Sequence, residues 1–311
     1  MTQQIMRITN NMLGSQLLMN LNRNAQQMNN TQTQLATGRK INKPSDDPVG
    51  ITYSLRYRAE LSSNEQYQKN VDSAVSWLEF NDTVLNQAGN VVQRLRELTV
   101  QASTGTNPQT ALDSINEEVK QLKEQLIDIS NSKLNGKYIF NGETYDVKPY
   151  DFPSNADGTL DTTNAASIVT DQGKINFIVG ESVQLPINVS GNEVFGTATE
   201  QDNLFVIMNT VMQALQDGDQ KELANQLDIM DSRMGKMLSI RSEIGAKTNR
   251  VDLMMGRLDD LGINLSDLQA KVEDADIAEL SLKSKIQENI YNASLSVGAK
   301  IISPSLVDFL R

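Results

Sequence analysis

The side chains in this sequence whose types and spacing could do chemistry are carboxylates in two short clusters. Asp46 and Asp47 are adjacent. A second cluster lies near the other end, at Glu273, Asp274, Asp276 and Glu279. Paired carboxylates can act as general acids or bases, or bind metal ions. The 311 residues include no His and no Cys. Without these partners we expect both clusters to be helix caps and solvated faces, and we expect no enzyme activity, metal or cofactor.

Three other patterns suggest ligand binding and fail on their details. The segment 155–161 resembles a calcium loop, but Pro153 and Asn164 stand where two of its ligands belong. The Gly-Lys pairs at 136–137 and 173–174 lack the remaining residues of a phosphate-binding loop. The net charge of -11 argues against a nucleic-acid partner. A carboxylate-dependent hydrolase in the middle of the chain stays open as an alternative, and it requires acids that converge in a cleft.

The elements that carry these residues are mainly helices, because apolar residues recur at steps of three and four. One such seam runs from Leu112 to Ile129, a second from Val71 to Leu95, and the longest from Leu223 to Leu258. The longest seam contains two polar positions, Arg241 and Thr248. These seams predict helices within about 52–104, over 110–130 and over about 219–262. Such rods bury too little surface alone and must pack together.

Residues 141–202 have a different pattern, with short β-type alternations separated by Asp, Asn and Gly turns. The alternations lie at 175–177 and 183–189. This stretch holds ten acidic residues against Lys148 and Lys174, a net charge of -8. We therefore expect a small inserted β domain that faces water and is dispensable for binding partners.

The two ends carry thin apolar stripes among Asn, Gln and Thr, and we expect them to be disordered alone and to fold on assembly. Residues 1–45 contain no acidic residue, so they could lie against the acidic cluster at 273–279. The stripes predict an assembly interface formed by Leu18, Leu21, Met28, Leu35, Leu282, Ile286, Ile290, Val297, Ile301 and Leu310. No stretch reaches the ~20 apolar residues of a membrane span, and the first residues lack the apolar core of a secretory signal.

The predicted fold is mainly α: an elongated antiparallel helical-bundle rod with terminal coiled-coil helices and a small inserted β domain. We expect a terminal helical domain from 1–45 with 265–311. The helical rod would comprise 46–140 with 203–264, and the β-rich insertion 141–202.

Several motifs, in order along the chain, resemble those of the flagellin superfamily. The segment 35–48, Leu-Ala-Thr-Gly-Arg-Lys-Ile-Asn-Lys-Pro-Ser-Asp-Asp-Pro, is similar to its N-terminal signature. Segments 93–102, 241–250, 272–279 and 306–311 resemble its two rod helices, its C-terminal helix and its end. The matching signature residues are Gly38, Ser45, Asp46, Asp47, Pro48, Arg94, Glu97, Asn249, Arg250, Asp274 and Asp276.

Within the family, the segments 44–48 and 136–142 resemble the members found between hook and filament more than filament flagellin. The resemblance implies an extracellular structural adaptor that joins hook-associated protein 1 to flagellin and contacts copies of itself. It also implies export by the flagellar type III apparatus with a chaperone and without a cleaved signal peptide. Filament-forming flagellin is the alternative.

Overall fold

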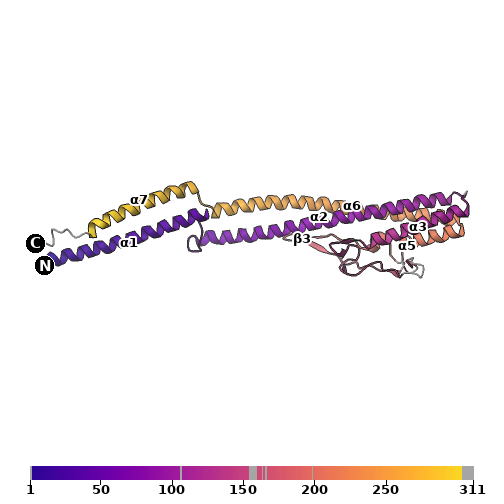
Figure 1. Cartoon of the computed structure of the whole chain (residues 1–311), viewed down its shortest axis with the longest axis horizontal. Helices are drawn as coiled ribbons and strands as arrows, with labels where there is room; N and C mark the ends of the chain where they lie inside the picture. The colour runs from indigo at the N-terminus through magenta and orange to yellow at the C-terminus, as the bar shows by residue number, and fades with distance from the viewer. Residues whose placement is uncertain are drawn as a thin grey trace. The chain divides into compact units, whose positions relative to one another are not determined.

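The structure is a computed structural model that describes residues 2–105, 107–153, 160–162, 164, 167–197 and 199–302. It is mainly α, as predicted. The described elements in chain order are α1 (Thr2–Thr37), α2 (Pro48–Ser103), α3 (Gln109–Ser130), β1 (Lys133–Leu134), β2 (Lys137–Tyr138), β3 (Asn176–Gly180), β4 (Val183–Pro186), α4 (Gly191–Phe195), α5 (Leu204–Asp217), α6 (Gln220–Glu273) and α7 (Ile277–Ile302) (Figure 1).

The chain forms two compact units. The first comprises Met1–Ser63 with Leu261–Arg311, and the second is Asn64–Asp260. Helices α2 and α6 each contribute to both units. We predicted three domains with boundaries near 45 and 264, and that division stays a prediction. The observed units place the first turns of α2 and the last turns of α6 with the terminal helices.

In the first unit, α1 and α7 lie side by side and run antiparallel (Figure 1). The backbone pair between Arg39 and Asp274 marks one end of their contact. Near the other end, a Cβ atom added to Gly298 would lie 2.9 Å from Leu17 Cδ2. The predicted pairing of the two ends into a coiled-coil-like unit is thus present within one chain.

The second unit is built on α2 and α6, which run antiparallel. Asn64 Nδ2 donates to the Leu258 carbonyl oxygen at 3.0 Å, and Arg96 Nε donates to Asp231 Oδ1 at 2.7 Å. Midway between these contacts, Arg241 forms an ion pair with Asp82 at 2.9 Å. The polar seam position at Arg241 is therefore an interhelical contact. Helices α3 and α5 pack together in the same unit.

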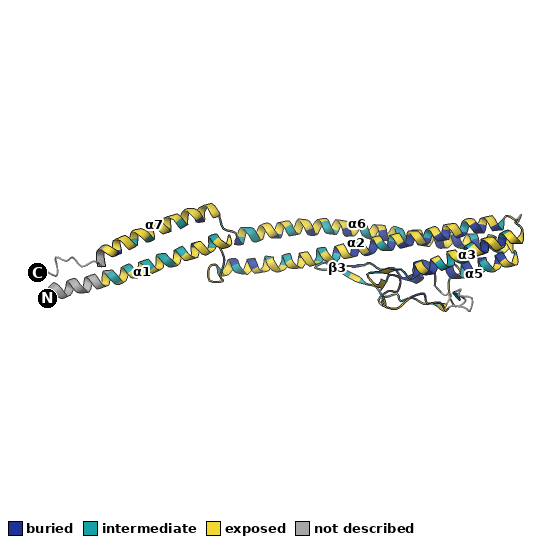
Figure 2. Ribbon diagram, in the orientation of Figure 1, coloured by how far each residue is buried: buried dark blue, intermediate teal, exposed yellow. Residues whose placement is uncertain are grey.

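The core follows the predicted seams with one refinement. On α6 every seventh residue is buried, at Leu223, Met230, Met237, Ile244, Val251 and Leu258. The intervening seam residues Leu227, Met234 and Met255 are half-buried. All predicted seam residues of α2 from Val71 to Leu95 are buried. Figure 2 shows the buried positions gathered along α2, α3, α5 and α6 of this unit.

The acidic insertion does not form a core of its own. Phe140, Tyr150 and Phe195 belong to the same hydrophobic cluster as the helices, and Tyr150 contacts Phe205 of α5 with ring centroids 5.0 Å apart. The strands are short: β3 and β4 pair antiparallel, with Phe177 opposite Leu185. The expectation of a separable, water-facing insertion is therefore wrong for its inner face, which completes the core of the second unit.

Candidate assembly site

A joint in the first unit connects four helix ends through backbone hydrogen bonds. Gly38 ends α1 with φ +71°, a conformation that glycine adopts without steric cost. Its carbonyl oxygen accepts from Ala275 N at 3.0 Å, and Lys40 N donates to the Glu273 carbonyl oxygen at 2.8 Å. The segment that follows α1 is therefore joined to the segment between α6 and α7. Gly38 and Asp274, both signature residues, take part through their backbones.

The side chain of Glu273 lies at the centre of this joint and is only 3% exposed. Arg58 of α2 donates to it twice, from Nε to Oε1 at 2.7 Å and from Nη2 to Oε2 at 2.6 Å. Ser54 and Gln269 also donate to Oε1. Arg39 adds an ion pair from Nε to Oε2 at 3.4 Å. One buried carboxylate thus contacts residues that follow α1, begin α2 and end α6.

The electrostatics of the joint favour an ionised Glu273. Hydrogen bonds from Arg58, Ser54 and Gln269 outweigh the cost of burial and lower the pKa of Glu273 to about 2. Charge-assisted hydrogen bonds of this bidentate kind are among the stronger ones in proteins. Glu273 is therefore a carboxylate throughout the neutral and mildly acidic range, with no proton to transfer near pH 7.

The other acidic residues of the two clusters accept hydrogen bonds from backbone nitrogens and so fix the turns and helix starts next to them. Asp46 accepts from the backbone nitrogens of Asn42 and Lys43 at 3.0 and 2.8 Å, and these bonds lower its pKa. Asp47 accepts from Val49 N and Gly50 N at the start of α2. Pro48 is the first residue of that helix, the position that proline favours.

Asp276 caps α7 by accepting from Ala278 N at 2.8 Å and Glu279 N at 3.1 Å. Ser45 is exposed in the turn before α2. The predicted role of these acids as caps is confirmed for Asp47 and Asp276. The prediction of a solvated face is wrong for Glu273. Its burial had one usable signal, the acid-free basic segment at 39–43, for which we did expect an acidic counterpart.

The two faces of α7 differ in a way that bears directly on assembly. The residues turned toward α1 are mostly small or polar: Leu280, Ser284, Gln287, Tyr291, Ser294 and Gly298 are buried or half-buried. The apolar stripe predicted from the sequence lies on another face and is exposed, with Leu282 at 64%, Ile286 at 49%, Ile290 at 47% and Val297 at 52%. Helix α7 therefore presents its most apolar face away from its partner helix.

The predicted interface residues thus divide into two groups. Leu21, Met28 and Leu35 of α1 are half-buried, while Leu18 is 57% exposed like the α7 stripe. The side chain of Ile301 and all of Leu310 lie outside the described residues. Periodicity indicated all of these positions, but it did not distinguish the residues facing the partner helix from those facing outward.

The signature residues of the second unit lie apart from the joint in sequence. Arg94 of α2 donates to Glu118 of α3 at 2.7 Å and to Glu97 at 3.0 Å. Asn249 and Arg250 are exposed on α6. The segment 136–142 forms the base of the insertion, where Phe140 is buried and Gly142 has φ +51° with no room for a Cβ beside Asp171.

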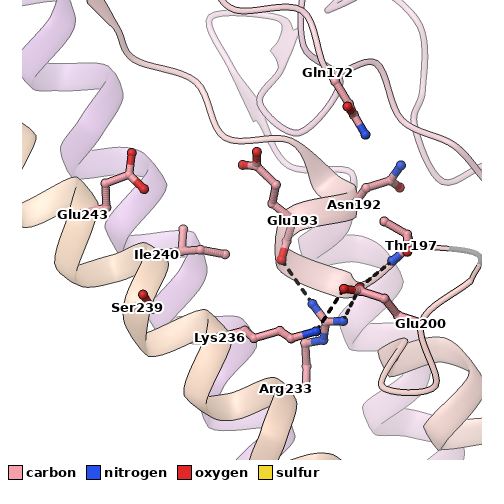
Figure 3. Close-up of a pocket in the computed structure, with 10 residues that line it drawn as sticks. All are labelled: Gln172, Asn192, Glu193, Thr197, Glu200, Arg233, Lys236, Ser239, Ile240 and Glu243. Atoms are coloured by element: carbon pink, nitrogen blue, oxygen red, sulfur yellow. Dashed lines mark hydrogen bonds and ion pairs between the residues drawn. The ribbon is translucent and has the colours of Figure 1, made fainter.

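A second charged network, not predicted from the sequence, surrounds Arg233 of α6 in the second unit (Figure 3). Its side chain is buried and donates to the carbonyl oxygens of Glu193 and Asp202 and to the carboxylates of Glu200 and Asp202. Lys236 joins the same two carboxylates. Hydrogen bonds from Arg233 and Lys236 lower the pKa of Glu200 to about 2. This network attaches the end of the insertion to α6.

An open pocket of about 340 Å³ lies beside this network, between the insertion and α6. Gln172, Asn192 and Glu193 line one side and Ser239, Ile240 and Glu243 the other (Figure 3). Within the described residues, no group of three or more potential metal-ligating side chains gathers anywhere. Of the charged residues that line the pocket, Arg233, Lys236 and Glu200 hold the insertion to α6, while Glu243 forms an ion pair with Lys247 of α6 at 2.9 Å.

No helix among the described residues combines the length and the hydropathy needed to cross a bilayer.

Comparison with known proteins relates both ends of the chain to one family. Residues 8–144 match the bacterial flagellin N-terminal helical region, and residues 227–310 match the bacterial flagellin C-terminal helical region. The chain is 27% identical to a flagellin of Bacillus subtilis, over 88% of this chain and 89% of that one. It is 23% identical to flagellar hook-associated protein 3 of Salmonella typhimurium, over 92% of each chain.

Its fold is similar to that of a putative flagellar hook-associated protein from Vibrio parahaemolyticus, with a TM-score of 0.65 and 18% identity. That likeness covers 74% of this chain and all of the other. The two matched helical regions together span most of the sequence and include the joint and the α7 stripe. The chain belongs to the bacterial flagellin family.

Proposed function

We propose that this chain is a structural adaptor of the bacterial flagellum that joins the hook, through hook-associated protein 1, to the flagellin filament. The observation that carries an assembly role is the exposed apolar stripe of α7 at Leu282, Ile286, Ile290 and Val297. Burying such side chains against neighbouring subunits releases about 25 cal/mol per Å² of apolar surface. Burial of the stripe would therefore favour binding of the terminal unit to other subunits.

Two observations support the junction over the filament. The likeness to hook-associated protein 3 extends over 92% of both chains, against 88% of this chain and 89% of the other for the flagellin of Bacillus subtilis. The segment 136–142, whose sequence suggests a junction member, builds the base of that insertion through Phe140 and Gly142. The proposed partners are hook-associated protein 1, flagellin and further copies of this chain in one layer.

The proposal includes the route to that location. The chain would be exported through the flagellar type III apparatus, held by an export chaperone, without a cleaved signal peptide. In the assembled flagellum it would be extracellular and would carry out no enzymatic reaction. The thin α1–α7 seam agrees with a terminal unit that unfolds readily for passage through a narrow channel.

The test is deletion of the gene in its own species, followed by electron microscopy and analysis of the culture medium. We expect cells with hooks, without filaments, and with flagellin released into the medium. Supplying the gene in trans should restore filaments. Normal filaments in the deletion strain would exclude an essential junction role.

The filament itself is the second candidate, favoured by the 27% identity to Bacillus subtilis flagellin over most of both chains. The purified chain distinguishes the two roles. A filament subunit should polymerise alone into long fibres after seeding, whereas an adaptor should bind hook ends in a limited layer. Long fibres made of this chain alone would favour the filament role.

A further inference from the structure

The hydrogen bonds that hold the Glu273 carboxylate come from α2 and α6. Arg58 and Ser54 of α2 and Gln269 of α6 donate to it. Oε1 accepts three of these four hydrogen bonds, and Oε2 accepts one, from Arg58 Nη2 at 2.6 Å. Both helices continue into the second unit, where Asn64 donates to the Leu258 carbonyl oxygen. The carboxylate is therefore held whether or not α1 and α7 are helical.

A second group of contacts comes from the residues that follow α1. Arg39 Nε lies 3.4 Å from Glu273 Oε2. Lys40 N donates to the Glu273 carbonyl oxygen at 2.8 Å. Ala275 N donates to the Gly38 carbonyl oxygen at 3.0 Å. These contacts connect the C-terminal end of α1 with the residues just before α7, and they add to a carboxylate that α2 and α6 already hold.

The residues between this segment and α2 form a turn through contacts that are local in sequence. Asp46 accepts from the backbone nitrogens of Asn42 and Lys43, and Asp46 N donates to the Lys43 carbonyl oxygen at 2.9 Å. Ile41 is buried, and its Cδ1 atom would lie 2.6 Å from a Cβ added to Gly50. Short loops of this kind cost little closure entropy. The turn therefore keeps the residues before it close to Glu273.

A helix is costly to begin and easy to extend, because its first turn fixes several residues for one hydrogen bond. We expect α1 and α7 to be disordered in the free chain, so both need such a beginning when they fold. We propose that the joint is a preformed nucleus for this step: α2 and α6 hold Glu273 in the free chain, residues 38–40 dock on it, and α1 and α7 then fold together, outward from the joint. The use of this step in assembly rests on the proposed function, whereas the order of folding within the chain does not.

The helix ends at the joint are suited to this role. Gly38 has φ +71°, and its N donates to the Gln34 carbonyl oxygen at 2.9 Å, which closes the last turn of α1. Gln34 Nε2 donates to the Lys40 carbonyl oxygen at 2.8 Å. Asp276 caps the first turn of α7. Farther along α7, by contrast, Gln287 Oε1 is buried without a hydrogen-bond partner, so the seam is less favourable there than at the joint.

The first test uses the full-length chain in solution and does not depend on the flagellum. Trimethylamine N-oxide strengthens the burial of surface, so we expect it to fold α1 and α7 in the free chain. Circular dichroism measures the gain of helix, and hydrogen exchange shows which helices gain it. Without the osmolyte, residues 54–63 and 261–273 should be protected in the wild-type chain, and α1 and α7 should exchange rapidly.

Two glycines of the N-terminal segment provide a matched pair of variants. Gly38→Ala places a side chain at φ +71° and should lower the equilibrium constant for folding of both α1 and α7 by about 5- to 30-fold. Gly14→Ala is the control, because Gly14 lies inside α1 and an added Cβ meets no atom within 4 Å. Since alanine favours helix over glycine, this variant should raise the same equilibrium constant by about 4-fold.

Two arginines test the docking of the segment on Glu273. Arg39→Gln removes the cation that this segment brings and leaves the donors of α2 and α6 in place, so we expect the folding constant of the ends to fall by about 2- to 5-fold. Arg23→Gln makes the same change at an exposed position of α1 and should have no such effect. Both variants should keep the wild-type protection of residues 54–63 and 261–273.

Several outcomes would overturn the proposal. Rapid exchange at 54–63 and 261–273 in the wild-type chain would show that Glu273 is not held before the ends fold, and protected α1 and α7 without the osmolyte would show that no folding step remains. Equal effects within either pair of variants, folding of α1 without α7, or no folding of the wild-type ends in the osmolyte would also contradict it. Failure of the wild-type gene to restore filaments would instead count against the proposed function and leave these results intact.

Discussion

At the scale of single residues, two buried ionic centres hold this protein together, and neither resembles a catalytic group. Glu273 is a carboxylate surrounded by donors, and Arg233 is a guanidinium surrounded by acceptors. In both cases the buried charge is matched by partners that come from elsewhere in the chain. Replacing one partner of a buried ion pair lowers the free energy of unfolding by more than the intact pair contributes, because the remaining charge is buried without a partner.

The pH dependence of stability should reveal Glu273. Its pKa is about 2 in the folded protein against an ordinary value of 4.5. A lowered pKa means that its contribution is complete above about pH 4.5 and is lost as the pH falls toward 2. The expected size is on the order of 3 kcal/mol. Urea unfolding followed by circular dichroism should show wild type more stable than Glu273→Gln at pH 7, with the difference shrinking by pH 3.

Asp267→Asn serves as the control for that measurement, because Asp267 is exposed near the same end of α6 and pairs with Lys271, so it should show no pH-dependent difference from wild type. A difference between wild type and Glu273→Gln that stays constant from pH 7 to pH 3 would contradict the assigned ionisation.

Replacing Arg233 with Met should destabilise the second unit. Asp202 is 9% exposed at its side chain and would lose a principal partner, so we expect a loss of about 3 to 5 kcal/mol. Trp77, the one tryptophan of the chain, lies in this unit and reports its unfolding by fluorescence. Arg250→Met, at an exposed position of the same helix, should change the stability by less than about 0.5 kcal/mol. Equal effects of the two variants would contradict the importance of burial.

At the scale of elements, the long helices follow directly from apolar periodicity. The seams predicted for α2, α3 and α6 are the buried faces of those helices. A helix has 3.6 residues per turn, so apolar residues at steps of three and four all lie on one face. Helix α6 nevertheless continues to Glu273, beyond the predicted end near 262. Leu265 continues the step of seven from Leu258 and is buried, and the contacts of Glu273 in the joint hold the last turn.

The α6 seam gives a direct test with two leucines. Leu223 is fully buried and Leu238 is 63% exposed on the same helix of the same unit. We expect Leu223→Ala to lower the free energy of unfolding by about 2 to 5 kcal/mol, because the substitution leaves a cavity. Leu238→Ala should have an effect below about 0.5 kcal/mol. Urea titration with Trp77 fluorescence measures both, and a larger effect at Leu238 would show that the register of α6 is wrong.

The sequence did not reveal which residues far apart in the chain contact one another in the fold. A stripe such as Leu282, Ile286 and Ile290 indicates a helix face, but its spacing does not tell whether α1 or another subunit covers it. Arg233 lies between the seam residues Met230 and Met234, and its partners come from an acidic stretch that we expected to face water. Charge alone did not separate the buried Glu273 from its exposed neighbour Asp274.

At the scale of the whole molecule, the apolar core and the assembly surface that we propose lie in different units. The second unit contains nearly all of the fully buried apolar side chains among the described residues, whereas the first leaves Leu282, Ile286 and Ile290 exposed. A protein built this way can keep one unit folded while the other exchanges contacts within the chain for contacts with neighbours.

Substitutions in the α7 stripe should therefore separate folding from assembly. Ile286→Ser together with Ile290→Ser should change the stability of the second unit by less than about 0.5 kcal/mol and abolish filament growth. Lys283→Ser together with Asn292→Ser changes two other exposed positions of α7 and should leave growth intact. Complementation of the deletion strain, scored by electron microscopy, measures both. Normal filaments with the Ile variants would remove the stripe from the assembly interface.

The sequence separation of the residues in the joint also determines when the joint can form. Arg58 and Glu273 are 215 residues apart in sequence, and the second unit, residues 64–260, lies between them in the chain. Contacts of such long range form late, because the chain must lose a large amount of loop entropy first. Under the export route that we propose, Arg58 and Glu273 would leave the channel at widely different times. The terminal unit would then close only after Glu273 had emerged, long after the segment around Arg58.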